Sequence, residues 1–533
     1  MTTGLLACTF ALVYALTRGH APADYDAVNF LLGVRDFDLG RHQPHPPGAP
    51  AFIAAGKALV WLGLSPLAAL IALSITGAML FVAVWHRMLL LVLAPGQALA
   101  AVVLLGLTPA IWLSATQPMS DTLAVSAVAA VQWQVLWYDR TRQPRHVWLA
   151  VLFAVLALGV RPQFGVFIIA MFCVSACYLR LPIPLLVRAV GWFFVLNLLW
   201  LLPVVVAQAQ QDGGNWFAYF KHIVLFYGEF SEASGSPVLA SSVDVLHVGE
   251  RVVAHVGSMG YFGAGLNLWY PESVAERLAS FGSQRTPIHA DLQEWSFAGS
   301  VFLVFYLIGA VCVLPRLRSA LQRREAQLLA LAATCYAVTV LLLVPPHTRF
   351  YLPLLPLLVL VPVAGLGRSQ VATVWRGAVC VVAIAALVSV VQDARQQVPP
   401  PLALAYDVVA LSEASSVPIH AVLDSNGRRH VQLLAPAVPQ ARRTEDTRDR
   451  IESWIDQGVR VVVSSPASVA HLGDRVRVEL VGEYRSALRV WMRHTGAQLY
   501  EVIPVEHTAT TDGGSTDGGA NAPPRARAVL GDG

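Results

Sequence analysis

The chain has 533 residues, of which 56% are hydrophobic and only 13% are charged, and its mean hydropathy is +0.57. These values exclude an ordinary soluble globular protein and indicate a polytopic membrane protein. The formal net charge of +4 comes almost wholly from arginine, because Lys57 and Lys221 are the only lysines. The arginines are scattered over short loops and form no basic face, which argues against a nucleic-acid partner.

Apolar runs long enough to cross about 30 Å of hydrocarbon recur from residue 5 to residue 391. They predict an all-α membrane bundle of about eleven transmembrane helices by the length criterion. The predicted spans are residues 5–18, 67–85, 97–115, 121–138, 147–160, 162–179, 189–207, 296–314, 327–344, 350–367 and 373–391. The first run could instead be a signal peptide, but the preceding MTTG carries no positive side chain, so we interpret it as an uncleaved span.

Basic residues fall in alternate loops between these spans. They are Arg87, Arg140, Arg142, Arg145, Arg180, Arg188, Arg316, Arg318, Arg323, Arg324, Arg368 and Arg376. Because Lys and Arg are retained on the cytoplasmic side, we expect these loops to face the cytoplasm and residues 19–66, 208–295 and everything after 391 to be external. Residues 51–63 are apolar but short, and we interpret them as a helix in the outer interface with Lys57 at headgroup level.

The first external loop carries four acids, Asp24, Asp26, Asp36 and Asp38. The apolar residues between Val28 and Val34 do not alternate, which predicts a short helix lying on the membrane surface. Asp26 falls in the first turn of that helix, where water is scarce, and is a candidate general base for hydroxyl chemistry. For Asp36 and Asp38 we favour a solvated rim.

The segment RHQPHPPGAP, residues 41–50, follows this helix. Its prolines fix φ and remove backbone donors, so we expect a stiff, extended loop that holds His42 and His45 beside the acids. These two histidines and Asp26 could bind a divalent metal. A His-x-x-His pair in an irregular loop is a weak metal signal, and orientation of a phosphate or of a neighbouring carboxylate is the favoured interpretation.

The second long external loop, residues 208–295, is rich in aromatic residues, which favours an interfacial belt, with stacking on a ligand as the alternative. Beyond residue 391 the pattern changes. PIHAVLDS and RVVVSSP predict short buried strands, and TEDTRDRIESWIDQG predicts an amphipathic helix closed by Gly458. We therefore expect a small external soluble α/β domain over residues 392–506 after a transmembrane domain over residues 1–391, and a disordered tail over residues 507–533.

Five segments follow one another along the chain: YDAVNF, RDFDLGRHQPHPPGAP, PAIWLSATQPMSDTLAV (109–125), LGVRPQFG (158–165) and PPHTRFYLPLLPLLV (345–359). In this order they resemble the membrane glycosyltransferases of the C superfamily, which include protein mannosyltransferases and the lipid A aminoarabinose transferase. The resemblance covers residues 1 to about 391. It implies an inverting hexosyl- or pentosyltransferase of the bacterial cell envelope that takes a sugar from a polyprenyl-phosphate carrier, at the external (periplasmic) face of the inner membrane, to a lipid, glycan or protein acceptor.

The resemblance also implies roles for acidic residues. Asp26 matches the family's catalytic acid in the first external loop, with Asp24 as the close rival. Asp121 fits the second acidic position, and a helix N-terminus following Ser120 is the structural alternative. One departure is that Gln43 and His45 stand where the aminoarabinose transferase pattern has an acid–lysine pair, so donor or acceptor recognition is expected to differ from that branch.

The phosphate of such a donor needs cations in a site of low dielectric. Arg161, His347, Arg349 and Lys57 all fall at outer ends of predicted spans, and we expect them to bind it, although a single basic residue at a span end is usually a snorkelling anchor. Arg349 is the first choice, because its planar fork binds phosphate oxygens in pairs. The main alternatives are a transporter or flippase, which would place polar or broken segments within its spans, and a structural membrane protein.

Overall fold

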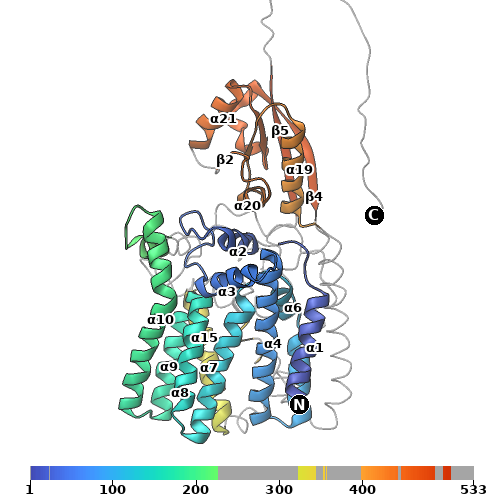
Figure 1. Cartoon of the computed structure of the whole chain (residues 1–533). Coiled ribbons are helices and arrows are strands. Elements are labelled where there is room, and N and C mark those ends of the chain that lie inside the picture. Colours follow the sequence, from blue (N-terminus) through green and yellow to red (C-terminus); the bar gives the residue numbers. More distant parts are fainter. Residues whose placement is uncertain are drawn as a thin grey trace, which may run out of the picture.

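A computed structural model of the chain describes residues 2–22, 25–225, 322–343, 352–354, 356, 398–441, 446–485 and 496–505. They form a helical bundle and, from residue 398 to residue 505, a β-sheet with helices on both faces, which we call the sheet unit. Figure 1 shows the sheet unit at one end of the bundle, with two short helices, α2 and α3, lying across that end. We call this end the mouth and the opposite end the basic end.

The bundle is built from α1 (Thr2–Leu16), α2 (Tyr25–Arg35), α3 (Pro50–Trp61), α4 (Pro66–Val92), α5 (Pro95–Leu107), α6 (Pro109–Thr116), α7 (Asp121–Thr141), α8 (Arg145–Val160), the 3-10 turn η1 (Pro162–Phe164), α9 (Gly165–Leu179), α10 (Ile183–Gln211) and α15 (Arg324–Leu343). Proline stands in the first turn of α3, α4, α5 and α6. Its missing N–H has no helical partner there and its fixed φ suits the helix, so these prolines set where the helices begin.

Three helical segments in the described residues are long and apolar enough to cross a membrane: Pro66–Val92, Pro162–Leu179 and Ile183–Gln211. α10 is the most lipid-like of them, because only 11% of its most apolar window is buried inside the protein. α1 and α8 are apolar but have 15 and 16 residues. The spans predicted at residues 296–314 and 373–391 lie outside the described residues, as does nearly all of the span at 350–367.

The span predicted as one helix over residues 97–115 is instead two helices. α5 and α6 are bent by 58° at a break, and only if the pair counts as one span does it raise the number of crossing segments to four. The break is at Thr108, whose extended backbone, with ψ of 128°, precedes Pro109. A residue before proline is pushed out of the helical region, which explains why the apolar run does not continue as one helix.

α4 and α7 pack backbone against backbone. A Cβ atom on Gly77 of α4 would lie 2.3 Å from the backbone nitrogen of Leu123 in α7, so no larger residue fits. At the same level, the Ser74 hydroxyl lies 2.8 Å from the Met119 carbonyl oxygen, and Thr122 donates a hydrogen bond to the Ser74 carbonyl. These contacts fix the start of α7 against α4, and Asp121 is the first residue of α7.

The helix predicted over residues 28–34 exists as α2, but it does not lie on a surface. Every residue from Asp26 to Val34 is buried. α3 covers one side of it, and α20 (Ser425–Leu434) of the sheet unit covers another: Arg35 donates a hydrogen bond of 3.0 Å to the Leu433 carbonyl. The sequence prediction of a surface helix was wrong because the partner helix is almost 400 residues away in sequence.

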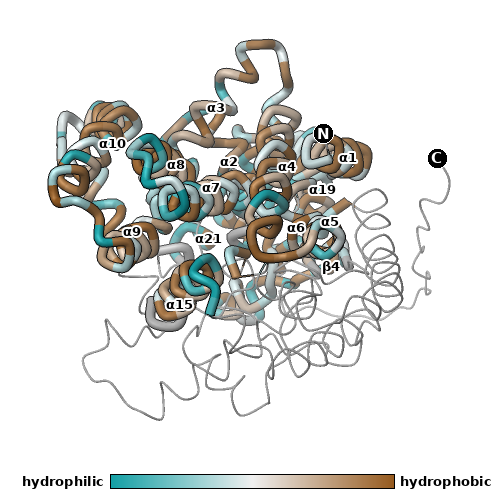
Figure 2. The backbone as a smooth tube through the Cα atoms, turned by 90° about the horizontal axis from the view of Figure 1, so that it is seen from below, coloured by the Kyte–Doolittle hydropathy of each residue, from teal (hydrophilic) through white to brown (hydrophobic). Residues whose placement is uncertain are grey.

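The basic turns meet at the end away from α2. Arg323 donates to the Val92 carbonyl, Arg142 donates to the Leu179 carbonyl, and Arg140 pairs with Glu325 at 2.7 Å. Seen from this end, the helices are mainly hydrophobic and the hydrophilic stretches gather in the connecting turns (Figure 2). Such amphiphilic ends are typical of membrane helices, whose charges stay outside the hydrocarbon.

The sheet unit contains α19 (Pro400–Ala414), β1 (Ile419–Val422), α20, β2 (Gln440–Ala441), α21 (Asp446–Asp456), β3 (Arg460–Val463), the 3-10 turns η5 (Pro466–Ser468) and η6 (Ala470–Arg475), β4 (Val476–Arg485) and β5 (Gly496–Pro504). The strand order is β2-β1-β3-β5-β4, with β1 parallel to β2 and β3, and β5 antiparallel to β3 and β4. Both predicted strands and the predicted helix are present, and Gly458 has the expected positive φ of 70°.

Two hydrophobic cores sandwich this sheet. Val462 faces the core formed with α19 and α20, while its neighbours Val461 and Val463 face the core formed with α21. This alternation is the period of two that a strand imposes on its side chains. Because α20 is packed on the sheet as well as on α2, it connects the sheet unit to the mouth of the bundle.

Candidate active site

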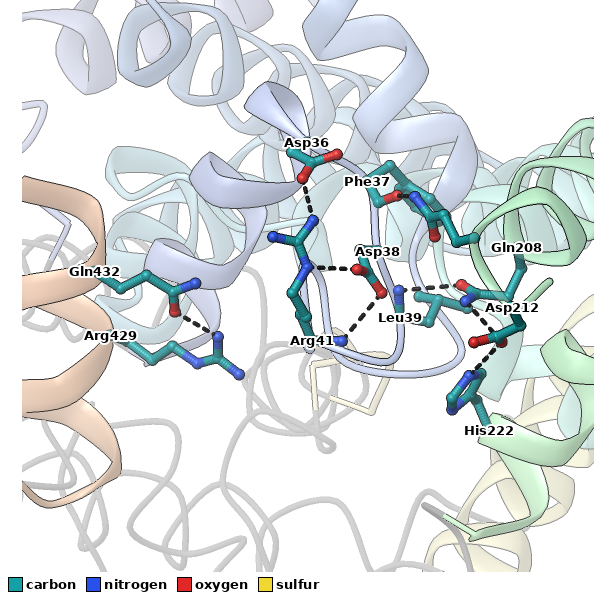
Figure 3. Close-up of polar contacts among 11 residues, drawn as sticks. Asp36, Phe37, Asp38, Leu39, Arg41, Gln208, Asp212, His222, Arg429 and Gln432 are labelled. Carbon is teal, nitrogen blue, oxygen red and sulfur yellow. Dashed lines mark hydrogen bonds and ion pairs between the residues drawn. The ribbon is translucent and has the colours of Figure 1, made fainter. Parts of the chain in front are cut away.

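The loop that follows α2 is a compact turn. Asp38 and Gln43 exchange two backbone hydrogen bonds of 2.8 and 2.7 Å across it. The guanidinium of Arg41 pairs with both Asp36 and Asp38, and these pairs raise the pKa of Arg41 while burial opposes the rise. Figure 3 shows Arg41 between the two carboxylates. The acids predicted as a solvated rim therefore have a structural partner, and they close the turn.

The C-terminal end of α10 braces the same turn. The Leu39 backbone N–H donates to the Gln208 side chain at 3.2 Å, and Gln208 donates in turn to Asp212 at 3.1 Å. His222 lies 2.9 Å from the same Asp212 oxygen, and this hydrogen bond is the main reason why the pKa of Asp212 is lowered (Figure 3). The Tyr219 hydroxyl donates to the Pro47 carbonyl at 3.3 Å.

Four aromatic residues of the second long loop, Trp216, Phe217, Tyr219 and Phe220, lie in the described part up to residue 225, and they differ in exposure. Tyr219 is only 2% exposed and supports the proline segment, whereas Trp216 is 60% exposed. Exposure at the mouth suits the predicted interfacial belt for Trp216. Tyr219 serves neither as a belt residue nor as an open stacking platform, because its ring is buried.

Asp26 and His45 come together, as the sequence predicted. The loop that carries His45 is turned and not extended as predicted, because Asp38 and Gln43 bond to each other across it. His45 Nδ1 lies 3.4 Å from Asp26 Oδ1, and the two residues are only 9% and 5% exposed. The His45 ring is 6.2 Å from that of Phe30, one helical turn beyond Asp26, and Phe30 packs edge-on against Phe52 of α3. A buried carboxylate that lies beside an imidazole and close to phenylalanine rings is a suitable acceptor for a hydroxyl proton.

Asp121 and Arg161 form a second buried pair. Arg161, in extended backbone just after α8, bonds through its Nη1 to Asp121 Oδ1, and the residues are 5% and 1% exposed. Asp121 is the first residue of α7 and follows Ser120, so the helix N-terminus given as the structural alternative is present beside the pair with Arg161. Within the described residues, Asp121 Oδ2 has no hydrogen-bond partner.

α3 connects the two pairs. The position of a Cβ on Gly159 of α8, two residues before Arg161, lies 3.0 Å from the Cβ of Ala51 in α3. Ala51 follows the proline segment, and Phe52 touches Phe30 of α2. Both pairs therefore belong to the mouth, where α2 and α3 cross the helix ends.

The remaining predicted residues are placed differently. Lys57 is exposed on α3, as expected for a headgroup anchor, and no ion pair of Lys57 is found among the described residues. His42 is half-buried in the turn with a positive φ of 57°. Asp24, His347 and Arg349 lie outside the described residues.

The predicted ligands of a divalent metal, Asp26, His42 and His45, all lie in the described part of the chain. In that part, no group of three or more His, Cys, Asp or Glu side chains could hold a metal ion. The structure therefore does not bring these three residues together as a metal site.

Two polar residues of the mouth were not predicted. Asn29, three residues after Asp26, is fully buried, and neither its amide nitrogen nor its amide oxygen has a partner within the described residues. Arg429 of α20 is 3% exposed, and its Nε has no partner there either. A polar residue on the same helix face as Asp26 was the available signal for Asn29, whereas nothing local in the sequence indicates Arg429.

No protein-family model matches the sequence, and no curated protein matches it. Among solved structures, the chain is similar to ArnT from Cupriavidus metallidurans bound to undecaprenyl phosphate, with 12% identity, a TM-score of 0.53 and coverage of 93% of this chain and 97% of that chain. The apo state of that protein matches with 13% identity, a TM-score of 0.43 and the same coverage. The chain thus shares its fold with the undecaprenyl-phosphate-bound ArnT structure, in line with the sequence resemblance.

Proposed function

We propose that the protein is an integral membrane glycosyltransferase that moves a sugar from a polyprenyl-phosphate carrier to an acceptor at the external face of the bacterial inner membrane. The observation that carries the proposal is the buried Asp26–His45 pair, held by the proline segment at the mouth of a bundle with this fold. The undecaprenyl phosphate bound to ArnT supports a carrier of the same class here. The sugar and the acceptor are left open.

The reaction proposed is a single displacement with inversion. An acceptor hydroxyl oxygen attacks the anomeric carbon, the bond between that carbon and the phosphate oxygen breaks, and the carrier leaves as polyprenyl phosphate. Asp26 takes the hydroxyl proton, and His45, 3.4 Å away, holds the carboxylate in position. General-base catalysis of this kind contributes roughly 10²- to 10⁴-fold to a rate.

Asp121 and Arg161 then act as a unit. Arg161 bonds to Asp121 through Nη1, which leaves its other N–H groups for a phosphate, and Asp121 Oδ2 is available to accept a hydrogen bond from a substrate hydroxyl. We propose Arg349, His347 and Lys57 as further phosphate ligands and Asp24 as a second acid. His42 is proposed to shape the turn that presents His45.

The proposal includes the finer topology. We propose about eleven spans by the length criterion, basic turns in the cytoplasm and a sheet unit outside the membrane. This topology is consistent with basic residues at one end of the bundle and the buried Asp26 and Asp121 pairs at the other. The domain limits at residues 391 and 506 are part of the same proposal.

One observation favours a second candidate, a transporter or flippase. The 58° break between α5 and α6 is the kind of interrupted helix that transporters use for binding. The two functions differ in outcome: a flippase moves the carrier lipid and leaves its sugar attached, whereas a transferase separates them.

The test uses the full-length protein in proteoliposomes with undecaprenyl phosphate carrying a radiolabelled sugar. The proposal predicts that label passes to an acceptor fraction of envelope lipids, glycans or proteins, with inverted anomeric configuration by NMR. Translocation of intact labelled carrier without any transfer would favour the flippase and contradict the proposed reaction.

A further inference from the structure

The boundary between α2 and α20 combines a buried charge with incompletely bonded polar atoms. The Arg429 guanidinium carbon lies 5.8 Å from the centre of the Tyr25 ring, and Tyr25 directly precedes Asp26. His430, the next residue of α20, lies 3.2 Å from the Pro22 carbonyl, just before α2. The guanidinium of Arg429 is therefore held next to the first turn of α2, where the candidate base stands.

Arg429 uses only part of its bonding capacity. Its Nη1 donates to Gln432 on the same helix at 2.8 Å, while Nε has no acceptor among the described residues. Figure 3 shows Arg429 and Gln432 leaving α20 toward the side of the 36–41 turn. In the described part of the chain, this buried guanidinium has a neutral amide and an aromatic ring beside it. No ion pair of Arg429 is found there, although buried charges normally have a counter-charge.

Asn29 lies one helical turn from Asp26 and Tyr25 on α2. Residues three and four apart share a helix face, so its amide is on the side that carries these two residues. Both of its polar atoms are buried and without a partner in the described part of the chain. Buried polar groups without a partner require an explanation in a native protein. A bound ligand would explain both Asn29 and Arg429, which lie near the candidate base.

We infer that Arg429 and Asn29 bind an anionic group of a substrate, a phosphate or a carboxylate, at the boundary between α2 and α20. The inference rests on the proposed function, because it takes the anion to belong to the carrier or to the acceptor. Arg429 supplies the positive charge and a planar pair of donors, and Asn29 supplies a neutral donor and an acceptor for an adjacent hydroxyl. The sheet unit thereby contributes a residue to the membrane-embedded site.

The first test compares Arg429→Gln with Arg428→Gln, which removes the same charge from the next residue of α20. Full-length protein in nanodiscs is titrated with undecaprenyl phosphate and, separately, with inorganic phosphate, and the KM for the acceptor is measured. Arg429→Gln is expected to weaken one of these interactions roughly tenfold or more, because a charged hydrogen bond is lost, and Arg428→Gln is not.

The arms separate the two sources of the anion. Weaker binding of undecaprenyl phosphate assigns the group to the carrier, whereas unchanged carrier binding with a raised KM assigns it to the acceptor. Equal behaviour of the two variants in all three measurements overturns the inference. A parent protein that transfers no sugar but loses inorganic phosphate binding on Arg429→Gln contradicts only the proposed function.

The second test measures the melting temperature of an Asn29 variant. If Asn29 served only the fold, its replacement would lower the melting temperature. Asn29→Leu removes the orphan polar atoms at similar volume and is expected to leave the melting temperature unchanged or raised, while transfer falls. The control is Asn197→Leu, because the amide of Asn197 donates to Phe193 and accepts from Trp200, so its loss lowers the melting temperature. A lower melting temperature for Asn29→Leu with normal kinetics would overturn the role of Asn29.

Discussion

The two ends of the bundle use polar residues in opposite ways. At the basic end, Arg140 pairs with Glu325 at 2.7 Å, and Asp139 accepts bonds from Arg142 and Arg324 at 2.9 Å. The three arginine side chains are 38–47% exposed, so water and counter-ions also stabilise their charges. The mouth also buries ionisable groups, namely Asp26, His45, Asp121, Arg161 and Arg429. There Asn29, Asp121 and Arg429 keep polar atoms without a described partner.

This difference separates structural charge from functional charge. Exposed, fully paired arginines anchor helix ends and contribute little to stability individually. Buried and incompletely bonded groups reduce stability unless something else satisfies them, which is characteristic of binding and catalytic sites. Substituting one ion pair at each end of the bundle tests this contrast between buried and exposed charges.

The largest effect is expected at the Asp121–Arg161 pair. Arg161→Met leaves the Asp121 carboxylate buried without its partner, and the free energy of unfolding is expected to fall by about 3–5 kcal/mol. The measurement is chemical unfolding of the full-length protein in detergent.

The double variant Asp121→Leu with Arg161→Met sharpens this prediction. Removing both charges eliminates the unpaired ion, so most of the stability is expected to return while sugar transfer does not. A double variant that regains transfer would show that the pair serves the fold and not the reaction.

These buried pairs also mark the limit of sequence-based prediction. The proline segment fixed His45 close enough to Asp26 for the pairing to be predicted, because only 18 residues of mostly constrained chain separate them. Asp121 and Arg161 were each identified, but in separate roles. Their pairing depends on how the start of α7 packs against the end of α8, which no local pattern encodes.

The fold shows the same division. Apolar runs predicted most of the described bundle helices, and short apolar runs predicted β1 and β3. The packing of α20 against α2 was not predicted, because α20 belongs to the sheet unit, which is distant from α2 in sequence. The bend at Thr108 was missed because hydropathy alone does not weigh the effect of Pro109 on its neighbour.

A smaller effect is expected at the brace of the mouth turn. Asp212→Asn weakens the contacts to His222 and Gln208, and the expected loss is below about 1 kcal/mol, because the Asp212 side chain is 35% exposed and screened. The pKa of Asp212 lies below its ordinary value of 3.8. Its contribution is therefore complete above about pH 4 and is lost as the pH falls through the lowered folded pKa.

Unfolding of the parent and of Asp212→Asn from pH 7 to pH 3 measures this contribution. The two stability curves are expected to converge at the acidic end. Curves that diverge as the pH falls would contradict the assigned direction of the pKa shift.

The smallest effect is expected at the basic end. Arg140→Gln removes the pair with Glu325, and the expected loss of stability is about 0.2–1 kcal/mol, decreasing with added salt. Thermal unfolding at two salt concentrations measures it, and the transfer rate is expected to stay unchanged. A slower transfer reaction in this variant would remove the contrast between the two ends.

The most direct test of the central claim compares two acids of the same loop. Asp26 is buried against His45, whereas Asp36 is 56% exposed and pairs with Arg41. Sugar transfer from polyprenyl phosphate is measured for Asp26→Asn and Asp36→Asn at equal amounts of folded protein. We predict that Asp26→Asn lowers the rate roughly 10²- to 10⁴-fold and that Asp36→Asn changes it little. Full activity of Asp26→Asn would contradict a mouth built around this carboxylate.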